Sequence, residues 1–313
     1  RSLDHIAQYP QVGCGVLRER IAESEGGKAE EVICGNGAAE VIFTLCHAVK
    51  PKRALIPAPT FAEYGQALAS TGCELEYYML TENDGFVLSE AYLDILHKGL
   101  DMAFLCNPNN PTGMLIPHRL LKRILEKCRK LDILLVVDEC FLDFVKEPEE
   151  YSLKHSLSGF NNLFILKAFT KRYAMAGVRL GYGLCSDRKL MERMELCVQP
   201  WNVSTMAQAA GLQALTETEY VEEGRQLVFR EAQWLKDELV RIGYKVFPSE
   251  ANYIFFKGPE ELFDFCLRKR ILIRDCSNYP GLTKGYYRIA VKRHEENVKL
   301  IEVLEGGILW QKQ

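Results

Sequence analysis

The stretch DMAFLCNPNNPTG, residues 101–113, joins a short apolar run to a turn rich in asparagine and proline. Residues 102–107 have the length and composition of a buried strand. Asn and Gly tolerate left-handed backbone angles and Pro fixes φ, so the strand can end abruptly in this turn. A plain turn needs fewer side-chain amides than are gathered here. We therefore predict that a ligand binds at the carboxyl end of this strand.

Similar apolar runs recur along the chain and alternate with helical patterns. In residues 117–131, for example, leucines recur at three- and four-residue steps, which is typical of an amphipathic helix. The runs ILLVV and LFIL are continuously apolar, which favours strands covered on both faces. The pattern predicts an α/β fold with a mostly parallel sheet between helices. The predicted strands are 53–59, 74–80, 102–107, 133–139, 163–169 and 180–185.

The pattern changes after about Pro200, where a long charged helical region covers residues 207–243. Three short strands with intervening helices are predicted beyond it, around 252–258, 271–276 and 286–292. We predict a large ligand-binding domain over 1–204, with an N-terminal arm at 1–15, and a smaller α+β domain over 205–313. The sequence contains no internal repeat and no low-complexity tract.

The composition sets limits on the class of protein. The 313 residues, of which 48% are hydrophobic and 26% charged, are enough for one large and one smaller domain. A net charge of −3 gives no general reason to bind nucleic acid or an acidic membrane surface. The eleven cysteines contain no C-x-x-C pair, which favours reduced thiols and a cytoplasmic protein. The six histidines lack metal-ligand spacing, so we expect no metal site.

A glycine-rich turn leads into an apolar helix at CGNGAAEVIFTLCHAV, residues 34–49. The small residues Gly37, Ala38 and Ala39 lie at its first turn, where free backbone N–H groups and the positive end of the helix dipole suit a phosphate. A helix start that needs small residues only for packing is the alternative. The stretch matches neither G-x-G-x-x-G nor the P-loop pattern, so neither a dinucleotide nor a nucleoside triphosphate is favoured.

The segment AFTKRYAMAGVRLGY, residues 168–182, places Lys171 directly after a strand and eight residues before Arg179. An amine at a strand end, beside an arginine and a hydroxyl that can hold phosphate, is suited to form a Schiff base with a phosphorylated aldehyde. A solvated surface lysine is the ordinary alternative. Lys167 is the competing amine, but it lies within the predicted strand.

Asp138 ends the apolar run ILLVVD and is expected at the same edge of the sheet, where ligands of open α/β sheets bind. A carboxylate there could keep a heteroaromatic nitrogen protonated and so make the ring an electron sink. A helix or loop cap would explain this aspartate equally well on its own.

Seven motifs occur in an order that resembles the pyridoxal-phosphate enzymes of the aspartate aminotransferase fold (fold type I, class I and II aminotransferases). The resemblance is to the branch with histidinol-phosphate aminotransferase and threonine-phosphate decarboxylase, and it extends over nearly the whole chain. It implies the aspartate aminotransferase-like form of the α/β fold predicted above. The motifs are YPQVGCGVLRERIA, GNGAAE, PAPTFAEY, NPNNPTG, DECFLDF, TKRYAMAGVRLGY and RDCSNYPGL with YYRIAV.

The resemblance implies pyridoxal 5'-phosphate as the cofactor, with Lys171 as its Schiff-base lysine and Asp138 as the partner of its pyridine nitrogen. Tyr9 resembles the residue that members of this family extend across a homodimer interface to the neighbouring cofactor phosphate. The other implied contacts are Gly37, Ala38, Ala39, Thr170 and Arg179 at the phosphate, Asn110 at the ring hydroxyl, and Phe61 stacked on the ring. One departure is Phe141, where many members have a tyrosine that contacts the ring hydroxyl.

The resemblance assigns the substrate carboxylate to Arg288 as a bidentate partner. A second arginine, Arg274, suits another anion such as a phosphate monoester, although a surface pair with Asp275 is the plain alternative. The runs RDCSNYPGL and QPWNVS resemble threonine-phosphate decarboxylases of cobalamin synthesis more than histidinol-phosphate aminotransferases. We therefore expect L-threonine-O-3-phosphate decarboxylase activity, with histidinol-phosphate aminotransferase or a related transaminase as the alternative. A non-catalytic homologue would lack Lys171, Asp138 or Arg288, and all three are present.

Overall fold

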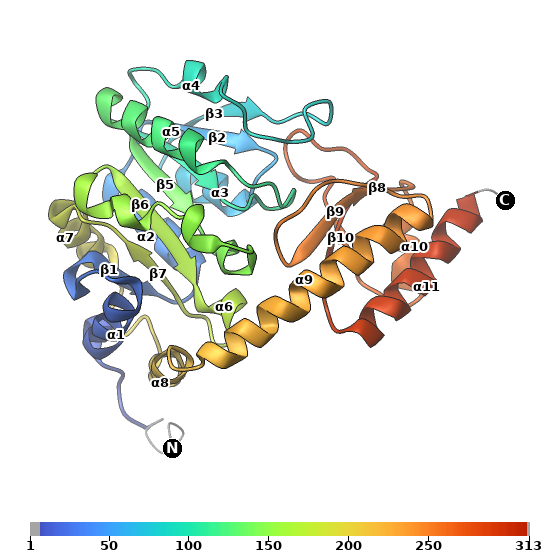
Figure 1. Cartoon of the computed structure of the whole chain (residues 1–313). Coiled ribbons are helices and arrows are strands. Elements are labelled where there is room, and N and C mark those ends of the chain that lie inside the picture. Colours follow the sequence, from blue (N-terminus) through green and yellow to red (C-terminus); the bar gives the residue numbers. More distant parts are fainter. Residues whose placement is uncertain (1–6, 312–313) are drawn as a thin grey trace.

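The computed structural model describes residues 7–311 and contains two β-sheets, one in each part of the chain (Figure 1). The large sheet has seven strands in the order β1-β7-β6-β5-β4-β2-β3. Strands β2 to β6 run parallel, whereas β7 is antiparallel to both of its neighbours. The strands are β1 Val32–Gly35, β2 Arg53–Ala58, β3 Glu74–Met79, β4 Met102–Cys106, β5 Leu134–Asp138, β6 Leu163–Ala168 and β7 Gly181–Leu184. The predicted α/β fold with a mostly parallel sheet is confirmed.

Helices cover both faces of this sheet. On one face α1, α4, α5 and α8 share a core with Val137 of β5, and on the other α2, α3 and α7 share a core with Val136. Alternate residues of one strand thus enter different cores, which explains the continuous hydrophobicity of ILLVV. The helices are α1 Gly15–Glu25, α2 Ala38–Val49, α3 Ala62–Ala69, α4 Tyr92–Ile95, α5 His118–Leu131, α6 Phe169–Arg172, α7 Arg188–Cys197 and α8 Thr205–Ala214.

The small domain is an antiparallel sheet, in the order β10-β11-β9-β8, packed against helices. Helix α9 runs from beside α8 to this domain in Figure 1. The elements are α9 Thr218–Arg241, β8 Lys245–Val246, β9 Tyr253–Lys257, α10 Leu262–Arg268, β10 Arg274–Asp275, β11 Tyr286–Ala290 and α11 His294–Gln311. None of the helices in the described part of the chain combines the length and the apolar character that a membrane span requires.

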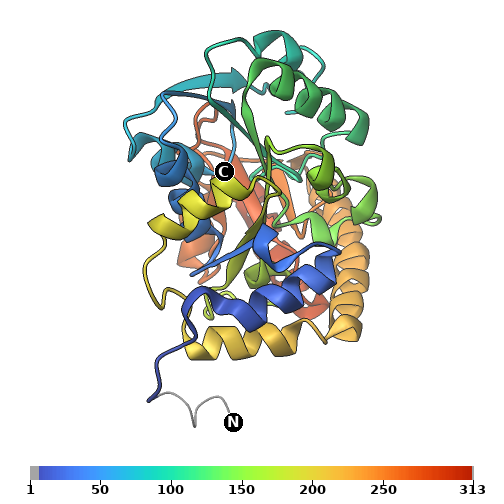
Figure 2. The same cartoon turned by 90° about the vertical axis from the view of Figure 1, so that its left-hand side faces the viewer.

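The sequence pattern missed the short strands β1 and β8 and merged α8 and α9 into one helical region. In the structure that region is interrupted after Ala214, and α8 packs beside α1 (Figure 2). A Cβ on Gly211 of α8 would lie 2.5 Å from Leu180 and 3.1 Å from Leu17, so the close approach depends on this glycine. The predicted boundary at 204/205 assigns α8 to the small domain, yet its packing partners belong to the large one.

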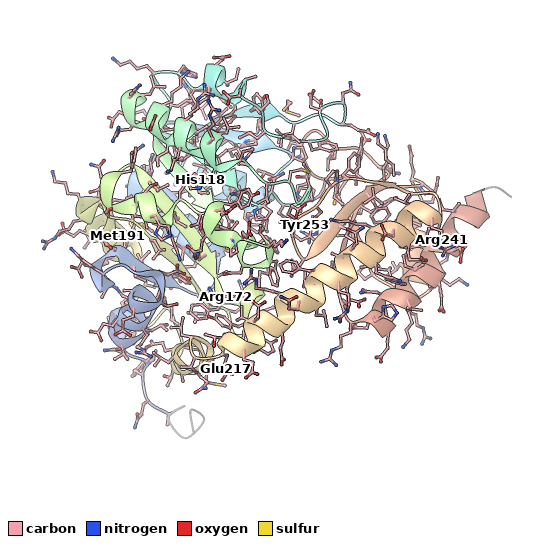
Figure 3. The ribbon with its side chains drawn as sticks, in the orientation of Figure 1. His118, Arg172, Met191, Glu217, Arg241 and Tyr253 are labelled. Atoms are coloured by element: carbon pink, nitrogen blue, oxygen red, sulfur yellow. The ribbon has the colours of Figure 1, made fainter. Side chains whose placement is uncertain are left out.

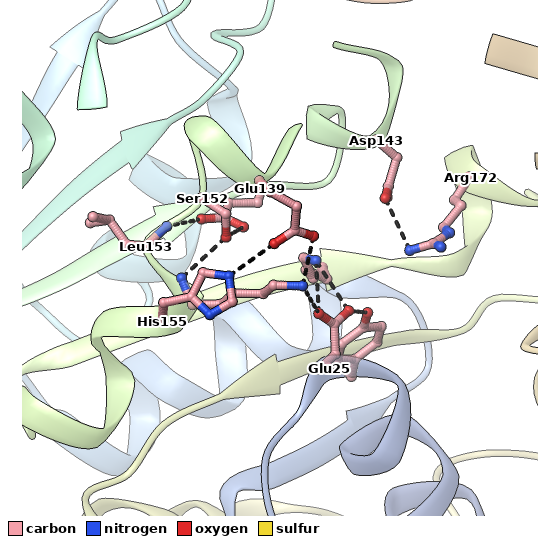
Figure 4. A network of polar contacts seen from close by, with 11 residues as sticks. Glu25, Glu139, Asp143, Ser152, Leu153, His155 and Arg172 are labelled. Atoms are coloured by element: carbon pink, nitrogen blue, oxygen red, sulfur yellow. Dashed lines mark hydrogen bonds and ion pairs between the residues drawn. The ribbon is translucent and has the colours of Figure 1, made fainter. Parts of the chain in front are cut away.

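A buried polar network ties α1 to β6 and β7 (Figure 4). Glu25, at the end of α1, accepts hydrogen bonds from Lys167 Nζ at 3.1 Å and Tyr182 Oη at 2.6 Å, and Lys154 Nζ lies 3.5 Å away. Burial raises the pKa of Glu25, but Lys167, Tyr182 and Lys154 together outweigh burial and lower the pKa to about 2. The glutamate is therefore held as a carboxylate within a charged cluster.

We expect Glu25→Gln to destabilise the protein in a pH-dependent way. A folded-state pKa of about 2, below the ordinary 4.5, means that the carboxylate stabilises the fold above pH 4.5 and loses this effect as the pH falls towards 2. Urea denaturation should give a free energy of unfolding about 3 kcal/mol lower at pH 6, and roughly half that difference at pH 3. Glu23→Gln, which removes a surface pair with Arg20, should change it by about 0.5 kcal/mol or less. A loss that is equal at both pH values would contradict the assignment.

Candidate active site

The asparagine-rich loop 107–113 follows β4, and its asparagines divide into two kinds. Asn107 and Asn109 hold the loop itself: Asn107 Oδ1 accepts from Ile116 N at 2.8 Å, and Asn109 Nδ2 donates to Pro59 O at 3.0 Å. Asn110 differs, because its side-chain oxygen accepts a hydrogen bond from Arg288 of the small domain. Two of the three amides therefore build the turn, and the third faces the site.

Asp138 is the last residue of β5 and is only 4% exposed. Its Oδ2 accepts from Tyr64 Oη at 2.5 Å, and its Oδ1 accepts from Cys140 N at 2.9 Å. Burial raises the pKa of this carboxyl, while the two hydrogen bonds and the nearby Lys171 partly oppose that effect. No ion pair within 4.0 Å involves Asp138 among residues 7–311. A buried carboxylate with neutral hydrogen-bond partners is suited to pair with a cationic ligand.

Tyr64 is a residue that the sequence analysis missed. It lies in α3, is completely buried, stacks on Phe104 at 4.9 Å between ring centroids, and meets Phe61 edge-on at 5.4 Å. One tyrosine therefore orients the carboxylate of Asp138 and supports the ring of Phe61. The motif PAPTFAEY contains this tyrosine, but the 74 residues that separate it from Asp138 gave no signal that the two meet.

Lys171 lies in α6, which follows β6 directly, and it lines a cavity together with residues of the small domain such as Arg288. Its Nζ is 5.4 Å from the centroid of the Phe141 ring. Burial against the walls of the site lowers the pKa of Lys171, and the cations Arg288 and Arg179 lower it further, against opposing effects of Cys140 and Asp138. A lowered pKa makes more of the neutral, nucleophilic amine available.

The competing amine, Lys167, lies in the interior on the α1 side of the sheet, where it pairs with Glu25 at 3.1 Å. Burial lowers the pKa of Lys167, but Glu25, Asp143 and Glu139 outweigh that effect and raise it above the ordinary value. This lysine remains a cation without access to the cavity. The structure thus separates the two candidates that the sequence left open.

A second group of residues forms a cradle at the start of α2. Gly37 has a φ of +82°, and a Cβ there would lie 2.4 Å from Arg179 Nη2, so the guanidinium lies directly over the glycine. A Cβ on Gly181 would lie 2.4 Å from Ala38 N, which shows how closely β7 approaches the first helical turn. Free first-turn N–H groups of Ala38 and Ala39 next to an arginine are suited to bind a phosphate.

Three further predicted residues have different surroundings. Thr170 is buried next to Lys171 in α6, and Phe61 is half-buried at the start of α3. Tyr9 is 81% exposed, and its ring packs on Trp201 at 4.8 Å. Within residues 7–311, Tyr9 is thus largely in solvent, and its ring contact is with Trp201 and not with the cradle of its own chain.

The small domain presents two arginines to the cavity. Arg274 of β10 lies directly opposite Arg288 of β11 in the antiparallel register, and both line a cavity of about 950 Å³ together with Lys171 and Phe141. Arg274 donates to Asn278 Oδ1 at 3.1 Å, whereas Asp275 accepts from Ser277, so the surface pair between Arg274 and Asp275 is not formed. Like charges directly across a strand pair repel each other. An anionic ligand between them would relieve this repulsion.

These residues fit pyridoxal phosphate. The cradle suits its phosphate, Asp138 suits a protonated ring nitrogen, and Lys171 suits its aldehyde. In residues 7–311 no three His, Cys, Asp or Glu side chains gather as metal ligands. Tyr253, which lies at the junction of the two domains (Figure 3), stands beside both Phe141 and Arg288 at 5.0 Å and completes the wall.

The chain belongs to the class I and II aminotransferase family, whose family model matches residues 4–304. It is 38% identical to the threonine-phosphate decarboxylase of Salmonella typhimurium over 97% of this chain and 84% of that protein. Among solved structures, the histidinol-phosphate aminotransferase from Clostridium acetobutylicum has a TM-score of 0.91 at 28% identity, covering 97% of this chain and 92% of that one. The L-threonine-O-3-phosphate decarboxylase from Porphyromonas gingivalis has a TM-score of 0.84 at 27% identity, covering 97% and 91%.

The protein is a pyridoxal-phosphate-dependent enzyme of this family. When bound, the cofactor supplies an electron sink for the charge that remains when a bond at the substrate Cα breaks. Lys171, Asp138 and the cradle at the start of α2 are the groups that would hold the cofactor.

We expect Arg288→Ala to raise the pKa of Lys171, because the substitution removes a neighbouring cation and opens the site to water. In the cofactor-free protein, the pH at which an amine reagent labels Lys171 at half its maximal rate should shift upward, as followed by mass spectrometry. Arg274→Ala serves as the control, because Arg274 is not among the groups with the largest effects on Lys171. An unchanged profile in Arg288→Ala would contradict this account.

Proposed function

We propose that the protein is an L-threonine-O-3-phosphate decarboxylase. The observation that carries the proposal is the pair Arg274 and Arg288, which face each other across β10 and β11 and line the same cavity as Lys171. Two guanidinium groups on one side of a reactive amine suit a substrate with two anionic groups around its own amine. An amino acid that carries a phosphate monoester meets this requirement.

Arg288 and Arg274 are assigned to different anionic groups of the substrate. Arg288 contacts Asn110 of the asparagine-rich loop 107–113. We therefore assign Arg288 to the substrate carboxylate, which is next to the reacting carbon. Arg274 lies one strand further out and is exposed, so we assign it to the more distant phosphate. Asn278, which accepts from Arg274, holds that guanidinium towards the cavity.

The reaction releases the substrate carboxylate as CO₂ and returns a proton to the same carbon. Lys171 is the residue that we propose to deliver this proton, because it lines the same cavity as Arg288 and its lowered pKa makes proton transfer to and from the amine easier. The 38% identical relative is named a threonine-phosphate decarboxylase, which supports loss of CO₂ over transfer of the amine and a place in cobalamin synthesis.

Histidinol-phosphate aminotransferase is the second candidate. It is favoured by the TM-score of 0.91 to a solved enzyme of that name, and its substrate also carries a phosphate monoester. That substrate has no carboxylate, so Arg288 would then serve the amino-acid partner of the transamination.

We further propose a cytoplasmic homodimer in which Tyr9 reaches the phosphate cradle of the second subunit. The exposed position of Tyr9 next to Trp201 supports such a contact. The eleven cysteines form no disulfide, and ten of them are buried, which supports a reducing compartment.

The deciding experiment compares two reactions of the purified holoenzyme. Incubation with O-phospho-L-threonine should release CO₂, whereas incubation with histidinol phosphate and 2-oxoglutarate should give little glutamate. Glutamate formation without CO₂ would replace the decarboxylase proposal with the aminotransferase.

Arg274→Ala should lower kcat/KM for O-phospho-L-threonine by roughly 10- to 100-fold, the cost of one or two charge-assisted hydrogen bonds. Arg274→Lys keeps the charge but loses the planar fork, so it should fall between the wild type and the alanine variant. Equal rates in all three proteins would exclude Arg274 from phosphate recognition.

Borohydride reduction of the holoenzyme should fix the cofactor on the peptide that contains Lys171. Lys171→Ala should abolish this label, while Lys167→Met should retain it because Lys167 lies outside the cavity. Recovery of the label on another lysine of the wild type would refute the assignment.

A further inference from the structure

A loop of the large domain, residues 80–88, reaches the sheet of the small domain. Its first residue, Leu80, donates its backbone N–H to Ala58 O at 2.7 Å, which anchors the loop to the end of β2. A hydrogen bond from Phe86 N to Thr81 O at 2.8 Å closes the turn. Two side chains of this loop, Glu82 and Phe86, then contact the small domain.

Glu82 receives donors from three strands of the small domain. Lys245 of β8 donates to Oε1 at 2.6 Å, Lys257 of β9 donates to Oε2 at 2.8 Å, and the hydroxyl of Tyr286 of β11 also donates to Oε2. The register places Lys245 opposite Lys257, and Lys257 opposite Tyr286, so the donors form one row across the sheet. These hydrogen bonds lower the pKa of Glu82 to about 2, so it stays a carboxylate at neutral pH.

Phe86 strengthens the same contact. It is 2% exposed and meets the rings of Phe247, Phe255 and Tyr286 edge-on, at centroid distances of 5.1, 5.4 and 5.9 Å. An isolated surface ion pair contributes little, because water screens it. Here three donors converge on one carboxylate beside a buried aromatic cluster, so the contact fixes the loop and the sheet relative to each other.

The three residues that donate to Glu82 lie next to the arginines of the candidate active site. Arg288 follows Tyr286 by two residues on β11 and lies opposite Phe255 on β9 and Arg274 on β10. Residues two apart on a strand share a face and lie roughly 7 Å apart. The position of β11 against the large domain therefore determines where the guanidinium of Arg288 lies.

We infer that Glu82 is a positioning residue for substrate binding: by holding the row Lys245, Lys257 and Tyr286, it sets the place of Arg288 and Arg274 relative to Lys171. It contacts neither arginine, so its effect passes through β11. The identity of the substrate in this inference rests on the proposed function.

The test is Glu82→Gln in the holoenzyme, which keeps the shape of the side chain and removes its charge. KM for O-phospho-L-threonine should rise about tenfold, while kcat changes by about twofold or less, since substrate that does bind meets the same reacting groups. Glu305→Gln is the matched control, because it removes a surface pair with Arg241 within the small domain. It should leave both constants unchanged.

A second measurement separates this inference from the proposed function. Inorganic phosphate, titrated into the holoenzyme by calorimetry, probes the arginine pair whatever the natural substrate is, and its Kd should also rise about tenfold in Glu82→Gln. If the wild type binds phosphate but releases no CO₂, the proposed function fails. The phosphate titration then tests by itself whether Glu82 positions the two arginines.

Tyr286→Phe provides a milder variant that keeps the aromatic ring and removes one donor. It should raise KM and the phosphate Kd in the same direction by a smaller factor, and it decides the matter if Glu82→Gln does not fold. Unchanged KM and phosphate Kd in both variants would overturn the inference. A parallel loss of kcat, cofactor binding and thermal stability would also overturn it, since that pattern indicates a role in stability only.

Discussion

The buried carboxylate of Asp138 is the constraint on which the rest of the site depends. Its negative charge has left water, and the protein offers it two neutral donors, Tyr64 Oη and Cys140 N, in place of a counter-ion. Such a charge is costly until a cation arrives, so the site favours a ligand with a protonated ring nitrogen. The end of β5, the helix α3 and the turn after Asp138 are all needed to hold this one group.

Two groups of polar residues, the candidate active site and the network around Glu25, lie on opposite faces of the sheet at β5 and β6. Asp138 and Glu139 are consecutive and therefore point to opposite sides of the sheet. Lys167 points to the α1 side from β6, whereas Lys171 lies in α6, beyond the end of that strand. Glu139 accepts from Ser152 and Leu153, and burial raises its pKa to about 7. The charged network on the α1 side thus stabilises the sheet, while the opposite side is left for chemistry.

The sequence was enough to predict the α/β fold, six of the seven strands of the large sheet and the motifs that gather at its edge. Several of these motifs follow a predicted strand, and the carboxyl ends of parallel strands lie at the same edge of the sheet. The positions of the motifs along the chain therefore predict that they come together. The role of Tyr64 was not predictable in this way, since it depends on a contact between α3 and β5. The short strands β1 and β8 were missed because their sequences show no clear hydrophobic period, and they are recognised only by their pairing with β7 and β9. The close approach of α8 to Leu17 and Leu180, which Gly211 permits, is likewise a tertiary contact that the sequence pattern does not show.

The loop 107–113 belongs to the large domain by sequence but is fastened to the small one. Tyr253 Oη donates to Asn109 O at 2.8 Å, and Glu250 N donates to Gly113 O at 2.9 Å. A Cβ on Gly113 would lie 2.0 Å from Ser249 Oγ, so even an alanine there would force the two apart. A chimera that joins this large domain to the small domain of a relative would therefore have to take the matching loop with it. The loop 107–113 and the residues 249–253 that contact it are therefore one structural unit, and they have to be exchanged together.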